Sequence, residues 1–352
     1  MKKLVLFIIL LFATTFFSVA QNTHPKIVAT ASMIADMAQN IVGDKFEVRT
    51  IVPIGKDPHT YEPTPRDATI VSRAEVVLKN SLTFEGWLEK LIDNSGTKAK
   101  VVTVTDGVDV IESLTYANSA DPHAWMSAVN GIAYAENIKN AMVAYDPANK
   151  DYYETNFATY SKKLKDLDNY IKSQVATIPE DQRILITSHD AFQYFGRRYG
   201  IRLESILGTS TDAQAQTSDI VRLNKVIKQN NVPAVFIEST VNPKMLQQLA
   251  NSNDITIGGS LYSDSIGDKD SDASTYYDML KFNTDVIVKA LSRKPGDAHD
   301  GHGHDHHHHG SDNENHNHEE VEVSSGNNFL MYGILGLLFI GGFFFVYRNM
   351  NK

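Results

Sequence analysis

Three histidines within residues 21–294, here called the body, lie where a strand pattern is followed by a helix pattern. Their motifs are Asp57-Pro58-His59, Asp121-Pro122-His123 and Ser188-His189-Asp190. Of the 13 histidines, nine lie between His299 and His318 and one is His24 near the start of the body, so the rest of the body contains only these three. Neutral imidazole is the commonest protein ligand of zinc. Three such positions in a body without cysteine predict one metal site, and the alternative is three unrelated surface histidines.

Alternating strand and helix patterns must position these histidines. In the first half, strands are expected at residues 27–31, 46–52, 75–78 and 100–104, and helices at 33–41, 68–73 and 85–91. In the second half, strands are expected at 183–187, 202–206, 234–238 and 255–257, and helices at 192–199, 218–229, 244–250 and 275–292. Such alternation indicates parallel strands with helices on both faces. The predicted fold class is α/β, with two parallel-sheet lobes.

One long amphipathic segment separates the two halves. Asp146-Pro147 marks its start, and no breaker follows until Pro179. Apolar residues recur at helical steps, at Tyr153, Phe157, Tyr160, Leu164, Leu167, Ile171 and Val175. The 32 residues from Pro147 to Ile178 would form a helix of about 48 Å. We therefore expect one long rigid helix (residues 146–179) to join an N-terminal lobe (21–145) to a C-terminal lobe (180–294), with limited hinge motion.

Open α/β sheets bind ligands beyond the carboxyl ends of their strands. His59 and His189 each follow a predicted strand, and Asp264 follows the strand near residue 255. His123 lies in the connection that leads towards the long helix. We expect these four side chains to converge in the cleft between the lobes.

The amino terminus reads as a secretory signal peptide, residues 1–20. Two lysines, an apolar run and small residues before Gln21 favour a signal over a membrane span, whose apolar run would be longer. The mature chain is therefore expected outside the cytoplasm. Its lack of cysteine excludes disulfides, thiolate ligands and an acylated cysteine as a membrane anchor.

The carboxyl terminus carries the pattern of a transmembrane anchor, residues 329–347. This stretch has no charged residue, and as a helix its first 18 residues would span about 27 Å. Acidic residues precede it, and Arg348 and Lys352 follow it. By the positive-inside rule the body lies on the periplasmic, extracytoplasmic face of the cytoplasmic membrane.

Between body and anchor, residues 295–328 consist mostly of His, Asp, Gly, Asn, Ser and Glu. This composition predicts a disordered, His-rich tether, because it offers too little apolar surface to fold. It also predicts an auxiliary metal-binding tract, and the irregular spacing favours a native segment over a purification tag. The candidate ligands are His299, His302, His304, His306, His307, His308, His309, His316 and His318.

The sequence also bears on other classes of function. A net charge of −9 and the absence of a basic cluster in the body argue against nucleic-acid binding. A zinc hydrolase would keep an open metal position and a general base. The chain has no His-Glu-x-x-His motif, and Glu238 is the only base to consider, so no enzymatic activity is expected. A metal buffer, surface or adhesion protein uncoupled from transport is the remaining alternative.

Five stretches resemble the solute-binding receptors of zinc and manganese ABC importers, a family whose two lobes are joined by one long backbone helix. They are residues 57–65, 84–88, 121–125, 188–195 and 264–267, spread over most of residues 26–291. The resemblance implies that His59 and His123 bind the metal from the first lobe, and His189 and Asp264 from the second. It implies a monomeric receptor that delivers Zn²⁺, or Mn²⁺, to an ABC permease with its ATPase. Many relatives carry a His-rich loop in the first lobe, whereas here that tract lies beside the anchor.

The ligand types favour zinc. Three imidazoles and one carboxylate suit a tetrahedral zinc site, although a bidentate carboxylate would raise the coordination number. The manganese-selective branch that this chain resembles places Glu where His189 stands. Asp57, Asp121 and Asp190 flank the histidines, and they either fix imidazole tautomers or cap the following helices.

Overall fold

The computed structural model describes residues 27–113, 119–212 and 215–292. The predicted signal peptide (1–20), the tether (295–328) with all nine of its histidines, and the anchor (329–347) lie outside the described residues. Among the described residues, no helix is both long and apolar enough to cross a membrane.

The first lobe is built on four parallel strands in the order β2-β1-β3-β4. The strands are β1 (Ile27–Ala29), β2 (Val48–Thr50), β3 (Val76–Lys79) and β4 (Lys100–Thr103). Ile27 and Ala29 pack towards α2 (Ser32–Val42), whereas Val28 packs towards α3 (Pro65–Ser72) and α4 (Leu88–Ser95). The two central strands, β1 and β3, are short apolar runs, as expected where helices cover both faces of a sheet.

The second lobe repeats this scheme with the order β6-β5-β7-β8, again all parallel. Its strands are β5 (Ile184–Thr187), β6 (Arg202–Ser205), β7 (Ala234–Glu238) and β8 (Thr256–Leu261). α8 (Thr217–Asn230) and α9 (Lys244–Asn253) cover one face, and α7 (Gln193–Tyr199) and α10 (Tyr276–Leu291) pack on the other. The predicted pair of parallel-sheet α/β lobes is thus confirmed.

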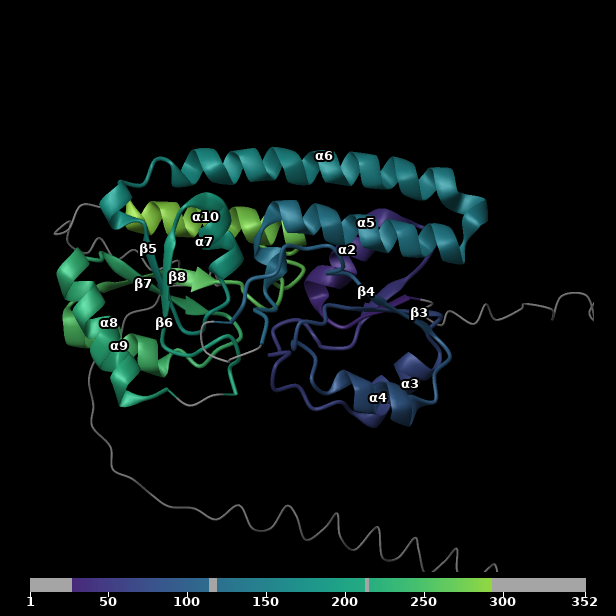
Figure 1. Cartoon of the computed structure of the whole chain (residues 1–352), viewed down its shortest axis with the longest axis horizontal. Coiled ribbons are helices and arrows are strands. Elements are labelled where there is room, and N and C mark those ends of the chain that lie inside the picture. The colour runs from purple at the N-terminus through teal and green to yellow at the C-terminus, as the bar shows by residue number, and fades with distance from the viewer. Residues whose placement is uncertain (1–26, 114–118, 213–214, 293–352) are drawn as a thin grey trace, which may run out of the picture. The chain divides into compact units, whose positions relative to one another are not determined.

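The long joining helix is confirmed as α6 (Lys150–Val175), which has 26 residues and runs across both lobes in Figure 1. It is shorter than predicted, because Pro147–Asn149 form a 3₁₀ turn and the chain leaves the helix after Val175. A second helix, α5 (Ala128–Tyr145), was not predicted, and it lies beneath α6. Three-residue 3₁₀ turns also stand at Ala124–Met126 and Glu180–Gln182.

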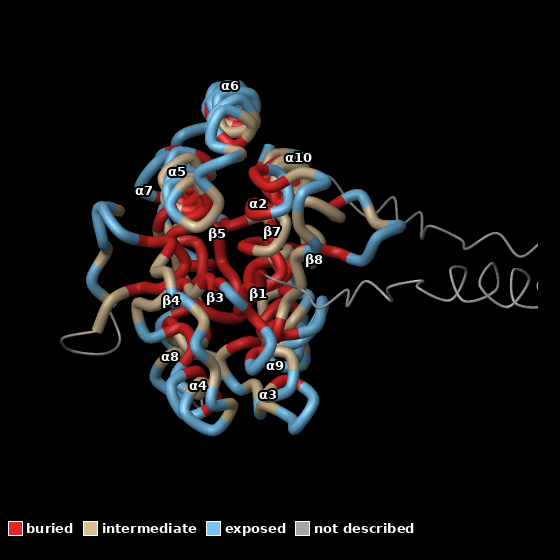
Figure 2. The backbone as a smooth tube through the Cα atoms, turned by 90° about the vertical axis from the view of Figure 1, so that its right-hand side faces the viewer, coloured by how far each residue is buried: buried red, intermediate tan, exposed pale blue. Residues whose placement is uncertain are grey.

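A single apolar core connects the two lobes. It includes strand residues of both sheets together with the inner faces of α2, α5, α6, α7 and α10, and the buried backbone forms the centre of the molecule in Figure 2. Trp125, Tyr194 and Tyr276 are among its largest fully buried side chains. Separating the lobes would expose this surface to water at a cost of about 25 cal/mol per Å² of apolar area. The shared core therefore opposes large hinge motions.

Helices α5 and α10 pack closely against each other across the lobes at Gly131. A Cβ atom added to Gly131 of α5 would lie 2.5 Å from the hydroxyl of Tyr276 on α10. That ring cannot move freely, because Tyr276 is buried and its hydroxyl donates to the Trp125 carbonyl at 2.5 Å. We expect Gly131→Ala to lower the free energy of unfolding by about 1–3 kcal/mol in chemical denaturation.

Gly86→Ala is the matched control, because an added Cβ there meets no atom within 4 Å. Equal stability of the two variants would contradict this account of the interlobe packing.

Candidate metal centre

The structure brings His59, His123, His189 and Asp264 together, with one potential ligand atom of each within 4.8 Å of the others. His59 Nε2 lies 3.2 Å from His123 Nε2, and Asp264 Oδ1 lies 3.4 Å from His123 Nε2. Asp264 Oδ2 lies 3.2 Å from His189 Nε2. In a tetrahedral site with Zn–N bonds of about 2.05 Å, neighbouring ligand atoms are about 3.3 Å apart. The spacing therefore suits one ion held by these four side chains.

Three of these side chains, His59, His189 and Asp264, follow strands as predicted, and His123 lies in the longer connection after β4. The strands are β2 for His59, β5 for His189 and β8 for Asp264. All the strands are parallel, so their carboxyl ends point the same way within each sheet. Two sheets that face each other across one gap can thus supply four side chains from four separate loops.

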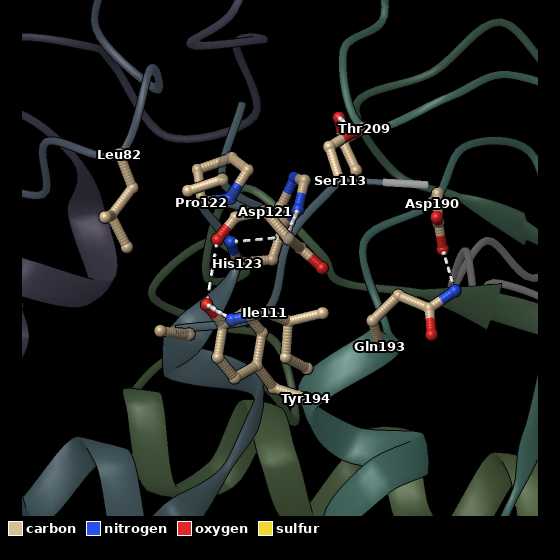
Figure 3. Close-up of polar contacts among 12 residues, drawn as sticks. Leu82, Ile111, Ser113, Asp121, Pro122, His123, Asp190, Gln193, Tyr194 and Thr209 are labelled. Atoms are coloured by element: carbon tan, nitrogen blue, oxygen red, sulfur yellow. Dashed lines mark hydrogen bonds and ion pairs between the residues drawn. The ribbon is translucent and has the colours of Figure 1, made fainter. Parts of the chain in front are cut away.

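Asp121 holds the ring of His123 in place. Its Oδ1 accepts from the His123 backbone N–H at 2.9 Å and lies 2.7 Å from ring Nδ1 (Figure 3). A proton on Nδ1 leaves Nε2 free to bind a metal. Tyr194 of the second lobe supports the same loop, because its hydroxyl donates to the Asp121 carbonyl at 2.9 Å. These contacts therefore support a role for Asp121 in fixing the tautomer of His123.

Glu238 has the corresponding position beside His189. Its Oε1 accepts from the His189 backbone N–H at 2.8 Å, and its Oε2 lies 2.7 Å from His189 Nδ1. From sequence, Glu238 was predicted only as a possible catalytic base, and its place beside His189 was not foreseen. The available signal was its place at the end of β7, which neighbours β5 in the sheet.

The other two flanking aspartates do not contact a ring. Asp57 accepts from the His59 backbone N–H at 2.9 Å and from the Thr211 hydroxyl of the second lobe at 2.5 Å. Asp190 accepts from the Gln193 side chain at 2.8 Å (Figure 3). Neither is the cap of a described helix, since Thr64 caps α3 and Phe192 precedes α7. These two carboxylates stabilise the loops that carry His59 and His189.

His59 marks the accessible side of the centre. Its side chain keeps 3% of its surface exposed, whereas the other three side chains keep none. A pocket of about 230 Å³ opens beside it, lined by His59, Thr83, Ser119, Pro122, Thr209, Ser210 and Asp212. On the opposite side the ring packs edge-to-face on Phe84, with centroids 5.2 Å apart. An ion would therefore reach the centre past His59.

Burial and neighbouring charges have opposite effects on the pKa values of the metal-free centre. Burial lowers the pKa of His59 to about 3. Burial also disfavours a proton on His123, but the carboxylate of Asp121 outweighs it and raises the pKa of His123 to about 9. For Asp264, burial is outweighed by the charges and contacts of His189 and His123, which hold the pKa of the carboxyl well below its usual range. Burial is likewise outweighed at His189 by the charges of Glu238 and Asp264, which raise its pKa well above the ordinary value. Protons on His123 and His189 thus offset the buried carboxylates, and a divalent cation could replace them.

Residues 27–290 match the family described as zinc-uptake complex component A, periplasmic. The chain belongs to this family. Its members are substrate-binding components of metal importers and not enzymes, which agrees with the expectation that this chain has no catalytic activity.

Curated relatives cover most of the chain. The metal ABC transporter substrate-binding lipoprotein FimA of Streptococcus parasanguinis is 38% identical over 309 residues, covering 83% of this chain and all of that protein. The manganese-binding lipoprotein MntA of Halalkalibacterium halodurans is 37% identical, covering 76% of this chain and 89% of that protein.

Solved structures share the fold. The periplasmic zinc-binding protein TroA of Treponema pallidum superposes with a TM-score of 0.73 at 30% identity, covering 76% of this chain and 99% of TroA. A manganese-bound periplasmic metal-binding protein of Candidatus Liberibacter asiaticus gives a TM-score of 0.70 at 31% identity, covering 75% of this chain and 98% of that protein.

The shifted pKa of His123 predicts how stability depends on pH. Its folded-state pKa of about 9 lies above the ordinary 6.5, so the protonated ring stabilises the metal-free fold below pH 6.5. This contribution is lost as the pH rises to about 9. We expect the free energy of unfolding of metal-free protein to fall by about 1–3 kcal/mol across this window in denaturant titrations.

Zinc-loaded protein should not show this fall, because the ion replaces the proton. Asp121→Asn, which removes the charge that raises the pKa of His123, should flatten the metal-free profile. Metal-free stability that is constant or rises over the same pH range would be evidence against this charge balance.

Proposed function

We propose that this protein is an extracytoplasmic, membrane-tethered receptor that captures Zn²⁺ between its lobes and presents it to an ABC permease with its ATPase. His59, His123, His189 and Asp264 are the proposed ligands. The observation that carries the proposal is the mutual spacing of their ligand atoms, which all lie within 4.8 Å of one another and include pairs at 3.2, 3.2, 3.4 and 3.9 Å. Asp121 and Glu238 are proposed to fix the two ring orientations.

Zinc is favoured by the donor set, because three imidazole nitrogens and one carboxylate match its preference in proteins. Manganese is the second candidate. MntA and several PsaA proteins among the relatives are named for manganese, and TroA is named for zinc. Asp264 directs one oxygen towards His123 and the other towards His189, so a bidentate carboxylate could serve a metal that requires more oxygen.

Metal titration tests the proposal. Residues 21–298 contain all of the described residues and end before the His-rich tract. We expect one tight Zn²⁺ per chain, with affinity lowered about 100-fold or more, or about 3 kcal/mol, by His189→Ala or Asp264→Ala. Asp268→Ala, an exposed aspartate in the same loop, is the matched control and should bind like wild type. Residues 21–328 should add only weaker sites, from the tract that we propose collects metal for the cleft.

Each result has a defined meaning. Tighter binding of Mn²⁺ than of Zn²⁺ would assign the receptor to manganese. The absence of any tight site in residues 21–298 would overturn the proposed ligands. Equal uptake of scarce metal with and without residues 299–318 would reject the collecting role of the tract.

We further propose that residues 329–347 anchor the receptor. FimA and MntA are named lipoproteins, but this chain has no cysteine that could be acylated. A carboxyl-terminal helix would supply the same tether and keep the receptor at a high local concentration near the permease.

Cell fractionation tests the anchor. The full chain should sediment with membranes and resist extraction by high salt, because the predicted span is held by apolar contacts. A chain that ends at residue 328 should appear in the soluble extracytoplasmic fraction. Membrane association that persists unchanged after this deletion would show that another part of the chain provides the anchor.

A further inference from the structure

The segment that carries Asp264 belongs to the second lobe by sequence, but the first lobe holds its backbone on both sides. It leaves β8 and runs to the start of α10. Before Asp264, the indole N–H of Trp125 donates to the Ser263 carbonyl at 2.8 Å. After it, the backbone N–H of Gly55 donates to the Ser265 hydroxyl at 2.9 Å. Both donors lie in the first lobe.

Ser32, the first residue of α2, makes the next contact. Its Oγ accepts from the Ile266 backbone N–H at 3.0 Å and lies 3.3 Å from the Ser265 Oγ. Ser265 donates its own proton to the Ile266 carbonyl at 2.8 Å, so the Ser32 proton is the one available for the contact between the hydroxyls. Ser32 is 5% exposed and Ser265 is 2% exposed. Water therefore cannot readily replace these bonds.

Asp36 lies one helical turn further along the same face of α2. Its Oδ2 accepts from the Tyr276 backbone N–H at 3.0 Å, at the first residue of α10. A carboxylate at a helix amino terminus is favoured by the helix dipole. The packing of α2 beside α10 places this contact at the far end of the Asp264 segment (Figure 1). One face of α2 thus binds both ends of the stretch from Ser265 to Tyr276.

The side chain of Asp264 has fewer constraints of its own. Its Oδ2 accepts from the Thr240 and Ser263 hydroxyls at 3.3 and 3.2 Å and lies 3.2 Å from His189 Nε2, and its Oδ1 lies 3.4 Å from His123 Nε2. Both accepted bonds are long. The anchors of the flanking backbone therefore help to place the carboxylate beside the histidines.

We propose that Ser32 and Asp36 of α2 are positioning residues that set the place of the Asp264 carboxylate, and with it the residence time of the bound ion. This inference rests on the proposed function. By this inference the first lobe positions three of the four proposed ligands, His59, His123 and Asp264, although Asp264 follows a second-lobe strand.

Release kinetics and a double-mutant cycle test the proposal. The full chain is loaded with one equivalent of Zn²⁺, and release to a chelator is followed by stopped flow; Co²⁺ in its place reports coordination by visible absorption. Ser32→Ala should speed release by about 10- to 100-fold and change the Co²⁺ spectrum. Ser32→Thr, which keeps the hydroxyl, should restore slow release. Asp36→Ala should act in the same direction, and Asp36→Asn, which keeps an acceptor oxygen, should have a smaller effect.

The double-mutant cycle distinguishes an effect on the position of Asp264 from a general weakening of the contacts between the lobes. In an Asp264→Ala background, Ser32→Ala should change the release rate by less than about twofold, because its effect passes through the missing carboxylate. Ser113→Ala removes another interlobe hydroxyl contact, 3.0 Å from Thr209, and should release metal like wild type. Thermal unfolding of each variant confirms that it is folded.

Wild-type release rates in Ser32→Ala, or an undiminished effect of Ser32→Ala without Asp264, would overturn the inference. A wild-type chain that fails to retain one equivalent of Zn²⁺ would instead refute the proposed function, and this result appears before any variant is compared.

Discussion

The burial of three imidazoles and one carboxylate within 4.8 Å of one another is the constraint on which the rest of the structure depends. Burying polar and charged groups is costly unless each has a partner. Carboxylates stand behind two of the rings, with Asp121 Oδ1 2.7 Å from His123 Nδ1 and Glu238 Oε2 2.7 Å from His189 Nδ1. Each of them also binds the backbone N–H of its histidine, so ring orientation and loop position are fixed together.

Parallel sheets and a shared core supply the rigidity that such a centre needs. The strands bring four loops to one gap, and the continuous apolar layer beneath α6 keeps the two sheets at a fixed distance. Interlobe hydrogen bonds complete the frame on both sides of the centre, from Tyr194 to the Asp121 loop and from Ser32 to the Asp264 loop. In a preformed site of this kind, little of the binding free energy is lost in ordering the ligand side chains.

The sequence predicted features that depend on local pattern, and missed those that depend on distant contacts. Apolar runs located the strands, and short polar motifs at their ends located the four side chains. Helix α5 was overlooked, because its small residues and Gly131 make a weak amphipathic pattern that becomes informative only when Tyr276 packs against it. The partners of the centre were equally hidden, since Glu238 lies 49 residues from His189 and Ser32 lies 234 residues from Ile266.

The same rigidity bears on the choice of metal. A site that cannot rearrange discriminates through the distances and donor types that it already presents, and here three of the four side chains are imidazoles at a spacing suited to bonds of about 2.05 Å. Mn²⁺ prefers more oxygen donors. The one adaptable donor is Asp264, whose two oxygens face different histidines. If the proposed function holds, the position of that carboxylate sets how far the site can depart from four-coordinate zinc, and the proposed role of α2 in holding its loop would then extend to metal selectivity.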